Sequence, residues 1–377
     1  PGNGNARYLE QMLASLFLIR PAWKWVLFSH KKLHPDYAEL LSHHQLRLIT
    51  GSRLPGPLWI HLTLPSLLQN YKHDVFWGTL AMLPLGYGRR AEAPAAVNFH
   101  DLNAFVAPES MVRWNAWQHR LTNERTLREA RTILCLSGAT AQDIRRVFPE
   151  SRNKRMVVVY PGAEMRSESP QRPPPPVGNL RDFIFCVGTL ETRKNQITLV
   201  SAYLKARGTV DLPPLLLAGK KGWGNDDLYQ KLSTGVYSER QIYFLEEPDD
   251  GQLAWCYDQA AFVAQPSLHE GFGLPILEAM HHKKVLLLSD IAVFREVGQG
   301  NVFIPPLDVD AWARNLADFS VLSRTGQLRP RAFDPLYWSW KKRAEILAQA
   351  LEITASPQPG SLSGGWQQRR NQNQGVP

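Results

Sequence analysis

The sequence predicts an α/β protein built from two doubly wound, parallel-sheet domains that face each other across a cleft. Short, uniformly apolar segments alternate with amphipathic helical segments, which is typical of parallel strands covered by helices on both faces. A proline-rich segment at 163–180, with four consecutive prolines, divides the chain into two parts of similar size and is expected to be a semi-rigid linker. The 377 residues are enough to form two hydrophobic cores.

The first domain is expected at 1–162. Apolar side chains at helical spacing between Tyr8 and Phe17 predict its first helix. Ser137 suits the N-cap of another helix that begins near Ala139. The segments expected to form strands are 25–28, 95–99, 131–136 and 156–160.

The second domain is expected at 181–336. It opens with the apolar segment 183–187, and a helix is expected around 195–207. The other segments expected to form strands are 215–218, 241–245, 260–264 and 285–288. Beyond it, the tail at 356–377 is too poor in apolar residues to fold, so we expect it to be disordered.

The net charge of +9 is unevenly distributed. Residues 1–162 hold 20 lysines and arginines against 11 aspartates and glutamates, whereas residues 163–377 hold 23 of each. A basic half-molecule suits an anionic lipid surface, a phosphorylated acceptor or a nucleic acid, although solubility alone would also explain it. We recognise no nucleic-acid-binding motif, and we expect no nucleic-acid partner.

One segment combines cationic and aromatic residues as membrane-interfacial segments do. Its residues are Arg20, Trp23, Lys24, Trp25, Lys31 and Lys32. An ordinary transition from helix to strand explains the same residues equally well. No apolar segment approaches the ~18 residues of a membrane span, and we recognise no secretory signal. Three widely spaced cysteines in apolar surroundings are expected to be core residues in a reducing cytosol.

The most informative segment is 269–280, with the sequence HEGFGLPILEAM. Gly271 and Gly273 allow a tight turn after the strand at 260–264, and Pro275 suits the first position of a helix. Such a turn presents free N–H groups to an anion, and Glu270 and Glu278 bracket it. Phosphate held by amides and hydroxyls held by carboxylates would suit a nucleotide sugar. The alternative is an ordinary strand-to-helix turn with two solvated carboxylates.

Three other segments carry polar groups at the ends of expected strands. The segment 188–195 places Arg193 and Lys194 after a glycine, where two cations can face a diphosphate. A second glycine-rich segment lies at 217–224, and His100 follows the strand at 95–99. Each has an ordinary structural alternative: a solvated cation pair, a turn glycine or a structural histidine.

Taken together, these segments resemble the retaining, group 1 (family 4) glycosyltransferases. The family pattern Glu-Gly-Phe-Gly-Leu-Pro-x-x-Glu-Ala is complete from Glu270 onward. The segments Gly188–Asn195 and His100–Leu102 also match, and Gly2–Tyr8 resembles the family's glycine loop. The resemblance implies the GT-B fold, in which a helix at 337–355 crosses back to the first domain. It also implies a strand before the glycine loop, which we expect to be missing from the first sheet.

The resemblance implies a metal-independent, retaining transfer of a hexose of mannose or glucose type from a nucleotide-diphosphate sugar to a glycan or lipid-linked acceptor. No cofactor is implied beyond this donor substrate. The implied catalytic residues are His100, Glu270, Lys194 and Arg193. The implied donor-binding residues are Glu278, Gly271, Phe272, Gly273, Leu274, Gly188, Thr189, Gly219 and Gly4. Surface-polysaccharide assembly in the cytoplasm is expected, with peripheral attachment to the inner face of the cell membrane as an open alternative.

The chain departs from the family pattern at three places. Ala6 stands where a glycine is common, and Thr189 stands where many members have a phosphate-binding arginine. The helix after the key turn continues into His281, His282 and Lys283 instead of a glycine, at a cost of about 1 kcal/mol if that backbone is left-handed. Adjacent histidines on a helix point apart, so we expect no metal there. These departures leave a second hypothesis open: a catalytically degenerate GT-B scaffold in a polysaccharide-assembly complex.

Overall fold

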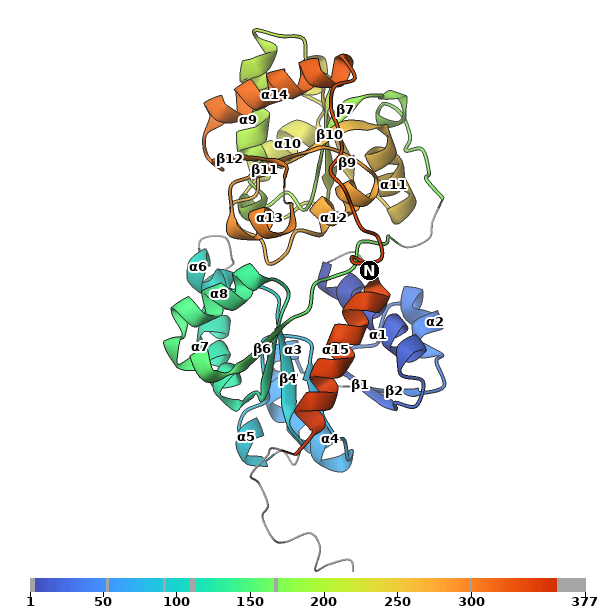
Figure 1. Ribbon diagram of the computed structural model, residues 1–377, viewed down its shortest axis with the longest axis vertical. Coiled ribbons are helices and arrows are strands. Elements are labelled where there is room, and N and C mark those ends of the chain that lie inside the picture. Colours follow the sequence, from blue (N-terminus) through green and yellow to red (C-terminus); the bar gives the residue numbers. More distant parts are fainter. Residues whose placement is uncertain are drawn as a thin grey trace, which may run out of the picture.

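The protein forms two α/β bodies, one from each half of the chain, joined by the segment at 163–180 (Figure 1). The computed structural model describes residues 4–51, 54–90, 93–108, 113–165, 169–298 and 300–357. Gly2 and most of the expected tail, residues 358–377, lie outside the described residues. In the described part of the linker, the regular structure is the short 3-10 turn η4 (Val177–Asn179).

The C-terminal body contains one six-stranded, wholly parallel sheet in the order β12-β11-β10-β7-β8-β9. Its strands are β7 (Phe183–Val187), β8 (Leu215–Gly219), β9 (Ile242–Glu246), β10 (Ala260–Gln265), β11 (Leu286–Ser289) and β12 (Val302–Ile304). This order makes the sheet doubly wound, with its topological switch between β7 and β10. In such sheets the crevice at the carboxyl ends of the switch strands is the usual ligand site.

Helices cover both faces of this sheet, as its uniformly buried strands require. The helices are α9 (Gln196–Arg207), α10 (Asp226–Ser233), α11 (Asp250–Gln259), α12 (Leu274–His281), α13 (Ala292–Val297) and α14 (Val309–Arg324). The short turns η5 (Thr192–Lys194) and η6 (Ser238–Arg240) lie between them. After α12 ends, Lys283 adopts a left-handed φ of 54°, which is the strained backbone that the missing glycine implied.

The N-terminal body contains two separate parallel sheets, β1-β2 and β3-β4-β5-β6. Their strands are β1 (Trp25–Ser29), β2 (Leu46–Thr50), β3 (Phe76–Gly78), β4 (Ala95–Phe99), β5 (Thr132–Cys135) and β6 (Arg155–Val158). A doubly wound sheet that lacked one inner strand would divide into two sheets in this way. The strand that the resemblance places before the glycine loop would be such a strand, and its absence stays a prediction. The rings of Trp25 on β1 and Trp77 on β3 lie 6.2 Å apart at this division.

The helices of this body surround the two sheets. They are α1 (Gly4–Ile19), α2 (Ala38–Leu41), α3 (Gly56–Leu62), α4 (Leu64–Asn70), α5 (Tyr87–Arg90), α6 (Asn103–Val106), α7 (Arg113–Glu129) and α8 (Gly138–Val147), with the turns η1 (Pro35–Tyr37) and η3 (Pro149–Asn153). The expected N-cap of α8 is present, because the Ser137 hydroxyl accepts a hydrogen bond from the Thr140 N–H at 3.0 Å.

The last helix, α15 (Trp340–Ala355), lies on the N-terminal body, where it packs against α1 and β4 (Figure 1). The Thr354 hydroxyl donates to the Thr132 hydroxyl on β5 at 2.7 Å, and Arg20 at the end of α1 pairs with Glu352 at 2.7 Å. The chain therefore crosses between the two bodies twice. Buried apolar side chains from both bodies also form one continuous cluster.

Candidate active site

The turn between β10 and α12 contacts the other body directly. Gly273 has a φ of 94° and is the N-cap of α12, with Pro275 in the first helical turn. A Cβ built on Gly271 would lie 1.9 Å from the main-chain oxygen of His100, so only glycine fits there. The Thr140 hydroxyl of the N-terminal body donates to the Gly271 carbonyl at 3.3 Å. The two segments that sequence motifs singled out are therefore in contact across the two bodies.

Glu270 and the two predicted cations form one ionic cluster. Lys194 Nζ lies 2.5 Å from one Glu270 oxygen, and Arg193 Nη1 lies 2.6 Å from the other. The Ser267 hydroxyl donates to the same carboxylate at 2.8 Å, and Glu191 accepts from Arg193 Nη2 at 2.5 Å. The Glu270 side chain is only 7% exposed. The loops after β7 and β10 thus meet at the switch point of the sheet.

The charges in this cluster determine its protonation. Burial alone would raise the pKa of Glu270, but the charges of Lys194 and Arg193 outweigh burial and lower that pKa to about 2. Burial lowers the pKa of Arg193, whereas the charges of Glu270 and Glu191 raise it by more. Glu270 and Arg193 are therefore ionised near neutral pH, and carboxylates hold Arg193 and Lys194 side by side.

Two glycines allow the backbone around Lys194 to pack closely. Gly188, with a φ of 148°, follows β7, and a Cβ built there would lie 3.3 Å from Lys194 Cε. Gly219, with a φ of 152°, ends β8, and its Cβ would lie 2.2 Å from the Gly188 oxygen. The Thr189 carbonyl accepts from the Gln196 amide at 2.9 Å. These predicted donor-side residues are therefore neighbours.

Glu278 is buried and has partners on both of its oxygens. Arg7 on α1 pairs with one oxygen at 2.6 Å, and the Tyr257 hydroxyl on α11 donates to the other at 2.7 Å. Burial, and then the charge of Glu278, raise the pKa of Tyr257 well above its ordinary value. This carboxylate, which the resemblance assigned to donor binding, is thus engaged within the protein. Sequence reasoning gave no role to Arg7 or Tyr257.

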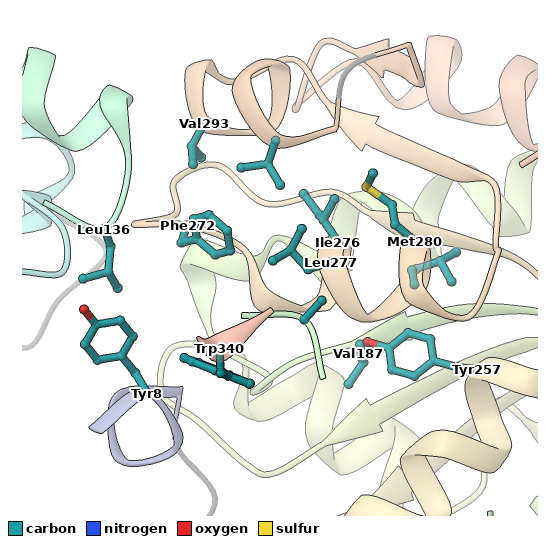
Figure 2. Close-up of a cluster of buried hydrophobic side chains, with 14 of the residues drawn as sticks. Tyr8, Leu136, Val187, Tyr257, Phe272, Ile276, Leu277, Met280, Val293 and Trp340 are labelled. Atoms are coloured by element: carbon teal, nitrogen blue, oxygen red, sulfur yellow. The ribbon is translucent and has the colours of Figure 1, made fainter. Parts of the chain in front are cut away.

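The beginning of α1 lies over the beginning of α12. A Cβ built on Gly4 would lie 3.3 Å from Leu274 Cδ1, which places this part of the predicted glycine loop next to the key turn. Figure 2 shows Tyr8 and Leu136 of the N-terminal body facing Phe272, with Trp340 between Tyr8 and the C-terminal body. Phe272 is only 4% exposed. Phe272, one of the predicted donor-binding residues, therefore packs between the two bodies.

His100 has one ring nitrogen engaged and one without a partner. Its Nε2 lies 2.8 Å from the Thr79 carbonyl oxygen, which can only accept, so Nε2 must carry the proton in the neutral ring. Its Nδ1 is buried and has no hydrogen-bond partner among the described residues. Burial lowers the pKa of His100 and favours this neutral form. Asp101 accepts from the Asn103 N–H at 3.0 Å and so orients the loop before α6.

Glu296, which was not among the predicted site residues, connects the two bodies at another point. It lies on α13 and accepts from the N–H groups of Gly138 and Ala139, the first residues of α8, at 2.6 and 2.8 Å. It also accepts from the Tyr160 hydroxyl at 2.7 Å. A carboxylate at a helix N-terminus is favoured by the helix dipole. This contact holds the C-terminal body against the strand ends of the N-terminal body.

Several other expectations are addressed by the described residues. No group of three or more His, Cys, Asp or Glu side chains in them could hold a metal ion, and His282 pairs with Asp258 at 2.7 Å. No helix in the described ranges is long and apolar enough to cross a membrane. Cys135, Cys186 and Cys256 are buried, as expected of core residues.

Comparisons with known proteins agree with this architecture. The profile described as Glycosyltransferase Family 4 matches residues 6–166, and the profile described as Glycosyl transferases group 1 matches residues 169–325. The chain belongs to the group 1, family 4 glycosyltransferases. These two matches cover the two bodies in turn.

Its relatives include mannosyltransferases of bacterial O-antigen synthesis. O-antigen chain mannosyltransferase B of Escherichia coli is 31% identical over 253 residues, which are 65% of this chain and 64% of that protein. Serotype-specific mannosyltransferase WbdA of Escherichia coli is 25% identical over 71% of this chain and 34% of its own length. O-antigen chain mannosyltransferase RfbU of Salmonella typhimurium is 22% identical over 74% of this chain and 78% of that protein. The chain thus spans less than two thirds of the first two.

Solved structures support the GT-B fold. The structure of Anabaena HepE in complex with UDP and glucose has a TM-score of 0.64, with 17% identity over 93% of this chain and 96% of that chain. The apo structure of OtsA has a TM-score of 0.62, with 14% identity over 94% of this chain and 92% of that chain. The predicted fold class, two Rossmann-like domains in a GT-B arrangement, is therefore confirmed.

Proposed function

We propose that this protein is a metal-independent, retaining glycosyltransferase that moves a hexose from a nucleotide-diphosphate sugar to a glycan or lipid-linked acceptor. The observation that carries the proposal is the ionic cluster of Glu270, Arg193 and Lys194 at the switch point of the C-terminal sheet. It adjoins Gly271, which contacts the His100 backbone across the two bodies. Two partly buried cations beside a glycine turn suit a diphosphate leaving group.

In the proposed reaction the bond between the sugar's anomeric carbon and the diphosphate oxygen breaks, and a bond from that carbon to an acceptor oxygen forms on the same face. The acceptor proton passes to the departing diphosphate. Lys194 and Arg193 would stabilise the charge that grows on the diphosphate, because preorganised charges in a partly buried site act strongly on such a transition state. The unpartnered Nδ1 of His100 would accept a hydrogen bond from a donor-sugar hydroxyl.

Mannose is the sugar that we favour over glucose, because the relatives bear the names of O-antigen mannosyltransferases. The acceptor would be a growing surface polysaccharide or its lipid-linked precursor at the cytoplasmic side of the cell membrane. The basic N-terminal half supports association with an anionic lipid surface there. Glu278 would meet the ribose only after it exchanges Arg7 or Tyr257 for the sugar hydroxyls.

The test is transfer of radiolabelled sugar from GDP-mannose, UDP-glucose and ADP-glucose to a lipid-linked or oligomannose acceptor, with and without a chelator. Lys194→Ala is expected to lower kcat by about a hundredfold or more, since one preorganised charge contributes roughly 3 kcal/mol. Lys205→Ala is the matched control, because Lys205 pairs with Asp310 at the surface. The anomeric configuration of the product, determined by NMR, tests retention. Absence of transfer from every donor would contradict the proposal.

The second candidate is a catalytically degenerate scaffold with the same fold. The observation that favours it is the engagement of both glutamates: Glu278 with Arg7 and Tyr257, and Glu270 with the two cations. Calorimetry with GDP, UDP and ADP separates the two hypotheses. A transferase that uses one of the three donors must bind the corresponding nucleotide, whereas a scaffold need not bind any of them.

A further inference from the structure

Helix α7 exposes a stripe of large apolar side chains to solvent. Trp114, Trp117 and Leu121 are 61%, 52% and 58% exposed, and their spacing places them on one helical face. The two indole rings stack on each other with centroids 5.0 Å apart. The opposite face of the helix is buried and includes Asn123 and Leu127. The stripe therefore points away from the core of the N-terminal body.

A neighbouring loop extends this apolar surface. Arg125, one helical turn beyond Leu121, donates to the carbonyls of Leu83 and Pro84 at 2.5 and 3.2 Å. Leu85, the next residue of this loop, is 54% exposed. We call Trp114, Trp117, Leu121 and Leu85 the α7 surface. Single exposed apolar residues are ordinary, but adjoining ones that include two tryptophans mark an interaction surface.

Cations accompany this surface. The sequence of α7 holds four arginines and two glutamates. Arg120 donates to the Ala104 carbonyl at 2.8 Å and Arg125 to two carbonyls, so main-chain oxygens fix both guanidiniums beside the stripe. The N-terminal half also carries all of the net positive charge of the chain. Tryptophan and leucine next to arginine are the composition of helices that lie in the interface of an anionic bilayer.

An oligosaccharide is the other occupant that stacked indole rings suit, and the exposed side chains of Leu121 and Leu85 favour a bilayer over it. In the cationic segment at 20–32, Lys24, Lys31 and Lys32 are exposed, but the aromatic side chains are not. Arg20 pairs with Glu352, and Trp23 and Trp25 pack together with centroids 5.6 Å apart, half-buried against the core. That segment therefore presents cations without the exposed indole rings of α7.

We propose that the α7 surface docks the protein on an anionic lipid bilayer. The proposed function includes association with an anionic lipid surface, and this proposal names the part of the protein that makes the contact. It rests on the proposed function, because that function supplies the lipid-linked acceptor. Helix α6, which follows His100 and Asp101, packs against α7. Both helices lie on the same side of the N-terminal body, with α6 next to the C-terminal body and α7 farther from it (Figure 1). Docking through α7 would therefore hold the candidate site close to the headgroups, where a lipid-linked acceptor ends.

The test is co-sedimentation of the full chain with phosphatidylcholine vesicles that contain or lack phosphatidylglycerol. The variant combines Trp114→Ser, Trp117→Ser and Leu121→Ser. The control combines Leu307→Ser and Leu336→Ser, which remove side chains that are 71% and 80% exposed on other surfaces. We expect the wild type and the control to bind anionic vesicles, and the variant to bind on the order of tenfold more weakly. Circular dichroism and GDP binding check that the variant folds.

Three outcomes would overturn the proposal. One is equal binding of the variant and the wild type to anionic vesicles, and another is absence of binding by the wild type. The third is evidence for a different occupant of the α7 surface. This would be dimerisation in solution, or a change in tryptophan fluorescence on addition of oligomannose, if the variant abolishes it and the wild type does not bind vesicles. Transfer to a water-soluble acceptor is measured separately. If the wild type transfers no sugar yet binds vesicles through α7, the proposed function fails and the membrane surface stands.

Discussion

Replacing Glu296 by alanine should separate the two bodies of the protein without unfolding either of them. The carboxylate accepts from the N–H groups of Gly138 and Ala139 and from the Tyr160 hydroxyl, and all three donors belong to the N-terminal body. Glu296 itself lies on α13 of the C-terminal body. Its removal leaves the first N–H groups of α8 without their acceptor, while the apolar side chains that pack within and between the bodies are kept.

The size of the effect follows from these contacts. A hydrogen bond to a charged group contributes about 1.5–3 kcal/mol, and a charge at a helix end contributes about 0.3–1 kcal/mol. At a partly exposed site, water replaces part of these hydrogen bonds when the carboxylate is removed. The contact between the two bodies should therefore lose roughly 2–4 kcal/mol of free energy. That corresponds to a decrease of about 30-fold to 1000-fold in the ratio of closed to open molecules. Glu296→Gln keeps one acceptor oxygen and should lose about half of the free energy.

The assay combines the radius of gyration from small-angle X-ray scattering with the kcat/KM for sugar transfer. Glu296→Ala should increase the radius of gyration and lower kcat/KM, while circular dichroism stays that of the wild type. Arg295→Ala is the matched control, because Arg295 lies on the same helix and pairs with Asp290 within its own body. The reasoning is wrong if Glu296→Ala leaves both quantities as they are in the control.

Three further predictions concern the cluster at the switch point. The pKa of Glu270 falls from 4.5 to about 2 on folding, so its carboxylate stabilises the fold fully above pH 4.5 and this contribution is lost as the pH falls toward 2. Glu270→Gln should therefore unfold at lower urea at pH 7 and vary less with pH across that window. Gly271→Ala would place a Cβ 1.9 Å from the His100 oxygen, and it should weaken GDP binding by about tenfold or more in calorimetry. Glu191→Gln removes the negative charge next to Arg193, so it should tighten binding of the diphosphate GDP more than binding of the monophosphate GMP. An equal change in the affinities for GDP and GMP would contradict this.

Much of the fold could be predicted because buried parallel strands appear in the sequence as continuous apolar segments. The expected strand at 183–187 coincides with β7, and the one at 95–99 coincides with β4. The strands that were missed lack this signal. β3 and β12 have three residues each, too few for any period, and β2 alternates arginine with apolar residues at its start.

The candidate site was only partly predictable. Glycines and charged residues at strand ends placed Glu270, Arg193 and Lys194 in one crevice, because neighbouring parallel strands end at the same edge of a sheet. Their direct pairing could not be predicted, since the sequence does not show which side chains of two separate loops meet. The partners of Glu278 illustrate the same limit. Arg7 is 271 positions away in the chain, and no local pattern connects the two residues.

The charge balance of the cluster constrains how a donor could enter. Arg193 and Lys194 bring two positive charges, and Glu270 and Glu191 bring two negative charges, so the cluster is neutral. A diphosphate would add negative charge at a site where effective dielectric constants are well below that of water. Donor binding therefore requires at least one glutamate to leave its cation. Glu191 is the one freer to move, because its side chain is 17% exposed and has one ion-pair partner among the described residues, whereas Glu270 is 7% exposed and has two.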